Sequence, residues 1–140
     1  MVNRRNRALV RALAPLALMG LIFFFSSQQA DEGFAWWEIV ARKIGHVGGY
    51  ALLTALWAWA LSDITGRPIA VAALITFVYA CTDEYHQSFV ETRNASPIDV
   101  GVDAIGIALA AWAISMRQSS RPPGRIDASG GKRARSSPVR

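Results

Sequence analysis

The chain has a single cysteine and few charged side chains, and both shortages restrict what it can be. Cys81 is the only thiol among 140 residues, so no disulfide can form within the chain. Its apolar surroundings argue against redox chemistry, and we expect it only to pack. Charged residues make up 18% of the sequence against 52% hydrophobic residues, and the mean hydropathy is +0.23. These proportions are unusual for a soluble domain and indicate a membrane protein.

Acidic residues are scarce at both ends of the chain, and basic residues are scarce in the middle. Residues 1–11 carry four arginines, residues 12–116 carry four basic and nine acidic residues, and residues 117–140 carry seven basic and one acidic residue. A pI near 10.1 also fits nucleic-acid binding. Basic residues confined to the two ends of an apolar chain instead follow membrane topology and attraction to anionic lipid, so we expect membrane lipids and no nucleic acid as partners.

Four apolar segments are candidates for membrane-spanning helices. They cover residues 12–25 with Ser26 and Ser27 as a last turn, residues 44–62, residues 68–83 and residues 98–116. A helix needs about 20 residues to cross the roughly 30 Å hydrocarbon layer, and these segments reach that length only with their polar ends. The third segment is the shortest, so we expect its helix to continue past Asp83 into a polar region lined by protein.

The flanks of the first segment bear on topology. Bulky residues 23–25 followed by glutamines fit a signal-peptide cleavage site poorly, so we expect an uncleaved helix. We expect residues 30–43 to form a loop. Its tryptophans, Trp36 and Trp37, then lie either in the lipid headgroup region or in ordinary packing.

The distribution of basic residues predicts an all-α, integral membrane four-helix bundle with both termini in the cytoplasm. Lys and Arg are enriched on the cytoplasmic side, and an even number of spans puts two basic ends there. We expect a basic cytoplasmic N-terminus (residues 1–11), a four-span domain (residues 12–116) and a disordered basic cytoplasmic tail (residues 117–140). The protein is then a multi-pass protein of the plasma (cytoplasmic) membrane, and its oligomeric state is left open.

Polar side chains gather where the expected spans meet the outer face. A charge at the centre of a bilayer costs roughly 2.5–3.5 kcal/mol on insertion scales, so such groups lie near an interface, line a polar cavity or pair. Helical spacing gives each segment one polar face, since Asp83 and Gln87 are four residues apart, as are Asp99 and Asp103. The candidate binding residues are Lys43, His46, Tyr50, Asp83, Glu84, Gln87, Arg93, Ser96, Asp99 and Asp103.

Four motifs follow one another at these places. They are Phe-Ser-Ser-Gln at residues 25–28, Lys43-x-x-His46-x-x-x-Tyr50, Asp83-Glu84-x-x-Gln87 and Arg93-x-x-Ser96-x-x-Asp99, followed by Gly106. With them the chain resembles the VanZ-like membrane proteins over about residues 20–116. That family is named for a protein that raises resistance to the glycopeptide antibiotic teicoplanin, so the resemblance implies a multi-span fold and a role at the cell envelope.

The chain departs from the family pattern in three places. Glu91 and Thr92 stand where a Pro-Gly turn often precedes the arginine, Asp103 stands where asparagine is common, and Ala110 replaces a frequent second glycine. The extra carboxylate of Asp103 adds charge to the site. Its preference for ligands or protons is therefore expected to differ.

Three hypotheses account for the polar residues. In the first they are structural, and Lys43 and Arg93 pair with carboxylates. Four carboxylates against two permanent cations weigh against it, because leftover buried anions need protons or other partners. In the second, Lys43, His46 and Arg93 bind the phosphate of an anionic or lipid-linked envelope component, and the apolar helices accept its lipid tail.

The third hypothesis is an integral membrane enzyme. Asp83, Glu84 and His46 are its candidate catalytic residues, acting by general acid–base chemistry or, with Asp99, by holding a divalent cation. No complete metal motif is visible, although His86 is a further candidate ligand. Adjacent residues on a helix point about 100° apart, so only one of Asp83 and Glu84 can enter a given site.

Overall fold

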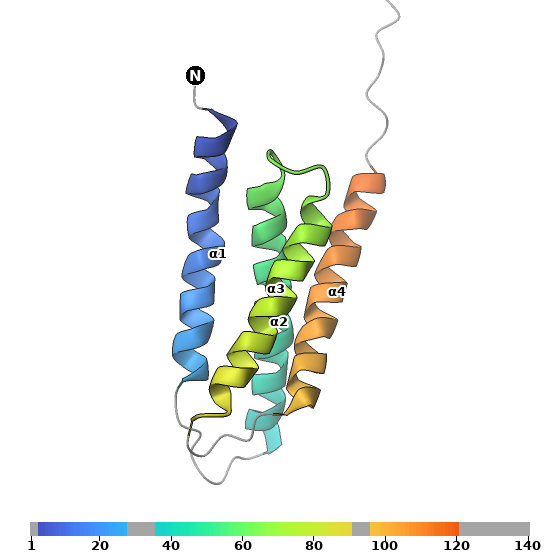
Figure 1. Cartoon of the computed structure of the whole chain (residues 1–140). Coiled ribbons are helices and arrows are strands. Elements are labelled where there is room, and N and C mark those ends of the chain that lie inside the picture. The colour runs from blue at the N-terminus through green and yellow to red at the C-terminus, as the bar shows by residue number, and fades with distance from the viewer. Residues whose placement is uncertain (1–2, 28–35, 91–95, 121–140) are drawn as a thin grey trace, which may run out of the picture.

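A computed structural model describes residues 3–27, 36–90 and 96–120, without the side chains of residues 38 and 39. It contains the helices α1 (Arg4–Ser26), α2 (Trp36–Leu61), α3 (Pro68–Gln87) and α4 (Pro97–Ser119). Consecutive helices run in opposite directions and pack into an upright bundle (Figure 1). The all-helical four-helix bundle expected from the sequence is confirmed.

The helix α2 lies at the centre of the packing. It contacts each of the other three helices, whereas α1 and α4 lie on opposite sides of the α2–α3 pair and do not contact each other. The helices α2 and α4 approach closely at Gly106, where an added Cβ would overlap the carbonyl oxygen of Val47. Gly45 and Gly101 have open space beside them, so of these glycines only Gly106 is required by a close approach.

Local sequence signals account for several helix ends. Asn3 caps α1 by accepting a hydrogen bond from the N–H of Arg5 (3.4 Å), and Ser96 caps α4 by accepting one from the N–H of Ile98 (3.2 Å). Proline stands at the start of α3 and of α4, where its missing N–H costs nothing. These signals mark where three of the described helices begin, namely α1, α3 and α4.

Two helices begin earlier than the hydropathy predicted. Residues 36–43 are the first two turns of α2, so the loop expected for that stretch is wrong over those residues, and α1 already includes the basic residues from Arg4 onward. Neither stretch contains a glycine or proline, and residues with good helix propensity, such as Ala and Arg, occur in both and continue each helix beyond its continuous apolar part. The expectation for residues 30–35 and for the tail beyond residue 120 lies outside the described residues.

The third helix continues through its polar end, as its short apolar length predicted. It reaches Gln87, and the side chains of Asp83, Glu84 and Gln87 are all buried. Among the described helices, α1, residues 40–61 of α2, and α4 are long and apolar enough to cross a membrane. The polar last turns of α3 keep it out of that group, although it runs beside the others along the bundle (Figure 1).

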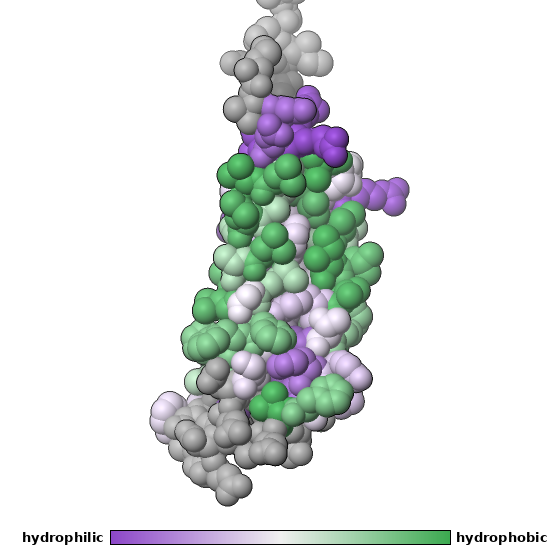
Figure 2. All heavy atoms as spheres, turned by 60° about the vertical axis from the view of Figure 1, so that its left-hand side comes forward, coloured by the Kyte–Doolittle hydropathy of each residue, from purple (hydrophilic) through white to green (hydrophobic). Residues whose placement is uncertain are grey.

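The bundle is apolar outside and partly polar inside. Many of its large apolar side chains are exposed, and so is Cys81, which was expected to pack. Figure 2 shows a broad hydrophobic band on the surface, with hydrophilic atoms above it and a smaller hydrophilic group near its lower end. The buried polar residues include Thr54, Thr76, Asp83 and Asp103. This inversion is the arrangement that lipid requires of a helical protein.

Charge separates the two ends of the bundle. We call the end with the start of α1, the α2–α3 turn and the end of α4 the basic end, because its described side chains include six arginines and one carboxylate. These are Arg4, Arg5, Arg7, Arg11, Arg67 and Arg117 with Asp63. The opposite end is the acidic end. Its described side chains include four carboxylates and two cations, namely Asp83, Glu84, Asp99 and Asp103 with Arg42 and Lys43.

Candidate functional site

Asp83 ties three helices together at the acidic end. It is 2% exposed, and its carboxylate accepts hydrogen bonds from Ser26 Oγ of α1 (2.6 Å), Tyr50 OH of α2 (3.2 Å) and Gln87 Nε2 one turn along α3 (3.0 Å). Tyr50 and Gln87 are themselves buried. Three neutral donors therefore surround a carboxylate that makes no ion pair within the part of the chain that the structure describes.

Glu84 turns to a different neighbour. Its Oε1 accepts a hydrogen bond from the backbone N–H of Ser96 (2.5 Å), the residue that caps α4. Its buried Oε2 has no hydrogen-bond partner among the described residues. Asp83 faces α1 and α2, and Glu84 faces the start of α4. The two adjacent carboxylates thus diverge, as helical geometry predicted.

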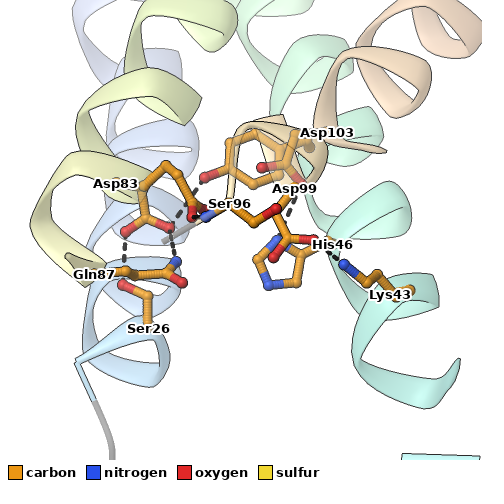
Figure 3. A network of polar contacts seen from close by, with 10 residues as sticks. Ser26, Lys43, His46, Asp83, Gln87, Ser96, Asp99 and Asp103 are labelled. Atoms are coloured by element: carbon orange, nitrogen blue, oxygen red, sulfur yellow. Dashed lines mark hydrogen bonds and ion pairs between the residues drawn. The ribbon is translucent and has the colours of Figure 1, made fainter. Parts of the chain in front are cut away.

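Two residues on one face of α2 pair with two residues on one face of α4. Lys43 Nζ forms an ion pair with Asp99, and His46 Nδ1 lies 3.0 Å from Asp103 Oδ1 (Figure 3). Asp103 is 1% exposed, so its carboxylate is sealed between the helices behind the imidazole. The His46 ring also stacks near Tyr50, with 6.2 Å between the ring centroids. Thus Lys43, first considered a phosphate ligand, is already engaged by a carboxylate.

A pocket of about 300 Å³ lies between α1 and α2 and reaches Asp83 of α3. The apolar part of its wall comes mostly from Leu21, Ile22 and Phe25 of α1 and from glycines of α2. Its polar part is formed by Ser26, Arg42, His46, Tyr50 and Asp83. An apolar wall with a polar end is suited to an amphiphile.

Most of the candidate binding residues lie at the acidic end, but they form separate contacts. Lys43, His46, Tyr50, Asp83, Glu84, Gln87, Ser96, Asp99 and Asp103 take part in the hydrogen bonds and ion pairs described above (Figure 3). Only His46, Tyr50 and Asp83 among them also line the pocket. Arg93 lies outside the described residues.

Arg42 lines the pocket but was not among the candidate residues predicted from the sequence. It adjoins Lys43, and successive helical residues point about 100° apart, so one turns toward α1 while the other turns toward α4. The family motif drew attention to Lys43. A helical projection of residues 42–46 with α1 on one side and α4 on the other would have separated the two cations.

The proposed metal ligands do not assemble within the described residues. No three His, Cys, Asp or Glu side chains there are placed to hold one metal ion. Asp83 and Glu84 diverge, and Asp99 faces Lys43. His86, the further candidate, packs its ring against Phe23, with 4.3 Å between centroids.

Four packed helices with an apolar exterior and polar groups buried near one end define a multi-pass membrane protein. The sequence pattern of the VanZ/LLP1 family matches residues 12–118, from within α1 almost to the end of α4, and the chain belongs to that family. The resemblance inferred from the four motifs is confirmed. Comparisons with curated proteins and with solved structures found no match.

Proposed function

We propose that the pocket between α1 and α2 binds a phosphate-bearing amphiphile of the cell envelope, either an anionic lipid or a lipid-linked precursor. The observation that carries the proposal is the lining of the pocket, which is apolar along α1 and the glycines of α2 and polar at Arg42, His46, Tyr50 and Asp83. The tail would lie against the apolar wall. The headgroup would meet the polar end.

Arg42 is the cation best suited to hold the phosphate. A guanidinium has five N–H donors and binds phosphate oxygens in pairs. Lys43 is less suited because its side chain points to Asp99 of α4 and does not line this pocket. His46 adds a second polar contact one helical turn along the same face of α2.

The acidic end is proposed to face outward. Lys and Arg concentrate on the cytoplasmic side of membrane proteins, and the six arginines of the basic end lie at the opposite end of the bundle from the pocket. Both termini would then be cytoplasmic, and the pocket would open near the outer leaflet.

The proposal is tested with the full-length protein in detergent micelles, titrated with a fluorescent anionic phospholipid. Losing a hydrogen bond to a charged group costs roughly 1.5–3 kcal/mol, so Arg42→Gln should weaken binding roughly 10- to 100-fold. The control is Arg4→Gln, the same substitution at the basic end, which should leave the affinity within about twofold. Equal affinities of all three proteins for the lipid would contradict the proposed site.

The family's namesake points to the same envelope role. We propose that the bound component affects glycopeptide susceptibility. Expression of the chain in a susceptible bacterium should then raise the inhibitory concentration of teicoplanin, and the Arg42→Gln protein should raise it less at equal expression. An unchanged inhibitory concentration would contradict the proposed effect on glycopeptide susceptibility and would leave only the proposed lipid binding.

The enzyme hypothesis is the alternative, with His46 as acid or base. The paired imidazole and carboxylate at the edge of the pocket favour it over the earlier combination of Asp83, Glu84 and Asp99. A purely structural network is the other alternative, and the three hydrogen bonds to Asp83 support it. The titration separates this alternative from ligand binding, since a structural network predicts no dependence of lipid affinity on Arg42.

A further inference from the structure

We infer that the headgroup accepted by this pocket carries an ammonium N–H group beside its phosphate, and that Asp103 orients His46 to accept it. The inference rests on the proposed function and narrows it for the same pocket: the phosphate is the anionic group already proposed, and the preferred headgroup carries an ammonium in addition. Two observations support it: His46 pairs with the buried carboxylate of Asp103, and two carboxylates near the pocket have no lysine or arginine partner among the described residues.

The pairing determines which nitrogen of His46 is offered to a ligand. An ionised carboxylate only accepts hydrogen bonds, so with a neutral imidazole the proton lies on Nδ1, which is 3.0 Å from Asp103 Oδ1. Nε2 is then an acceptor, and it lies on the side of the ring away from Asp103 (Figure 3). Since the His46 side chain lines the pocket, the side of the ring that faces away from Asp103 would offer this acceptor to a ligand there.

The charge around the pocket favours a ligand with a positive group. Within the described residues Lys43 pairs with Asp99, while Asp83 and Asp103 make no ion pair with a lysine or arginine. Asp83 is satisfied by hydroxyl and amide donors, and Asp103 by an imidazole. Two carboxylates near the pocket thus have neither a lysine nor an arginine as ion-pair partner among the described residues, so a cationic group of a ligand can supply one in a medium of low dielectric constant.

The same pocket also offers Arg42, which suits a phosphate. Arg42 and His46 are four residues apart on α2 and therefore lie on one face, a helical turn apart. A donor to phosphate next to an acceptor backed by a carboxylate matches a zwitterionic headgroup. A headgroup with phosphate alone would leave the acceptor at His46 without a partner, which carries a cost.

Three phospholipids with identical acyl chains separate these features. Phosphatidylethanolamine has a phosphate and an ammonium with N–H donors, phosphatidylcholine has a phosphate and a cation without N–H, and phosphatidylmethanol has only the phosphate. A hydrogen bond to a charged group contributes roughly 1.5–3 kcal/mol, so the full-length protein at pH 8 should bind the first lipid about tenfold more tightly than the other two.

Variants at the pair test the assignment to His46 and Asp103. His46→Phe keeps a ring beside Tyr50 but removes the acceptor, and it should reduce the preference for phosphatidylethanolamine to within about twofold. Asp103→Asn should do the same, because the amide can donate to Nδ1 and move the ring proton to Nε2. Arg42→Gln should weaken binding of all three lipids together, and Arg4→Gln should change none.

A readout without ligand tests the tautomer directly. In protein labelled with 15N at histidine, the spectrum at pH 8 should show His46 protonated at Nδ1 and unprotonated at Nε2, with assignment by the His46→Phe variant. The proton should move toward Nε2 in Asp103→Asn. A spectrum of wild-type His46 with the proton on Nε2 would overturn the inference.

The failures of the two proposals are distinguishable. If phosphatidylmethanol or phosphatidylcholine binds as tightly as phosphatidylethanolamine and Arg42→Gln still weakens them, the headgroup inference is wrong and the proposed phosphate site stands. If none of the three lipids binds, the proposed function itself is wrong.

Discussion

The two ends of the bundle hold their charges in opposite ways. At the basic end, Asp63 pairs with Arg11 (3.1 Å) and lies 3.7 Å from Arg7, and all three side chains remain partly exposed. The Arg11 guanidinium also lies 5.0 Å from the centre of the Trp59 ring. At the acidic end, Asp83 and Asp103 are almost completely buried and meet neutral donors or an imidazole.

The difference teaches what each end can contribute. Partly exposed ion pairs stabilise a protein little, by about 0–1 kcal/mol each, so the arginines of the basic end are expected to add little stability, and the proposed orientation is their expected role. Buried carboxylates are costly to desolvate and persist only where their hydrogen bonds are made. The acidic end is therefore where polar groups are held in fixed geometry, as a binding site requires.

The largest expected effect concerns sidedness. In a Cys81→Ser background, a cysteine in place of Ser88 at the acidic end should react completely with a membrane-impermeant maleimide added to intact cells. A cysteine in place of Gly66 in the α2–α3 turn should react only after the membrane is permeabilised. Reaction of both, or the reverse pattern, would contradict the proposed orientation with both termini inside.

The next largest effect contrasts the buried and exposed carboxylates. Asp83→Ala leaves the buried donors of Tyr50 and Gln87 without their acceptor and should lower the free energy of unfolding by about 3 kcal/mol, since each unsatisfied buried group costs about 1–3 kcal/mol. Asp63→Ala should cost about 1 kcal/mol or less. Unfolding by denaturant in mixed micelles measures both. Equal losses would remove the contrast between the ends.

The smallest effect tests the helix contact that aligns α2 with α4. Gly106→Ala forces a Cβ against the Val47 carbonyl and should lower the free energy of unfolding by about 1–3 kcal/mol. It should also weaken the His46–Asp103 contact one turn away. The matched change Gly101→Ala meets open space and should stabilise α4 by up to about 1 kcal/mol. A neutral Gly106→Ala would show that the helices can separate there without cost.

The fold was predictable because hydrophobicity and length alone restrict a membrane chain to helices. Even the polar last turns of α3 followed from the shortness of its apolar part. The starts of α1 and α2 were not predictable from hydropathy, because charged residues interrupt the apolar residues in the turns that extend these helices. Propensity and the absence of glycine or proline in residues 36–43 are the signals that mark that extension.

The sequence predicted which residues gather at one end of the bundle, but it did not predict which side chains contact each other. Helical spacing placed His46, Asp83 and Asp103 at one end of the bundle. Which carboxylate faces which cation depends on the rotation of each helix about its axis, and a single sequence does not fix that rotation. The same rotation explains why Arg42 lines the pocket while the neighbouring Lys43 meets Asp99.

The exposed wall of the pocket has a consequence for how a ligand reaches it. The pocket is bounded by α1 and α2, and two of its wall residues, Leu21 and Phe25, are more than half exposed on the apolar surface, at 51% and 60%. A lipid can therefore reach it by sideways diffusion in the bilayer without passing through water. Occupancy would then follow the mole fraction of that lipid in the surrounding leaflet, and dilution of the aqueous phase would not change it.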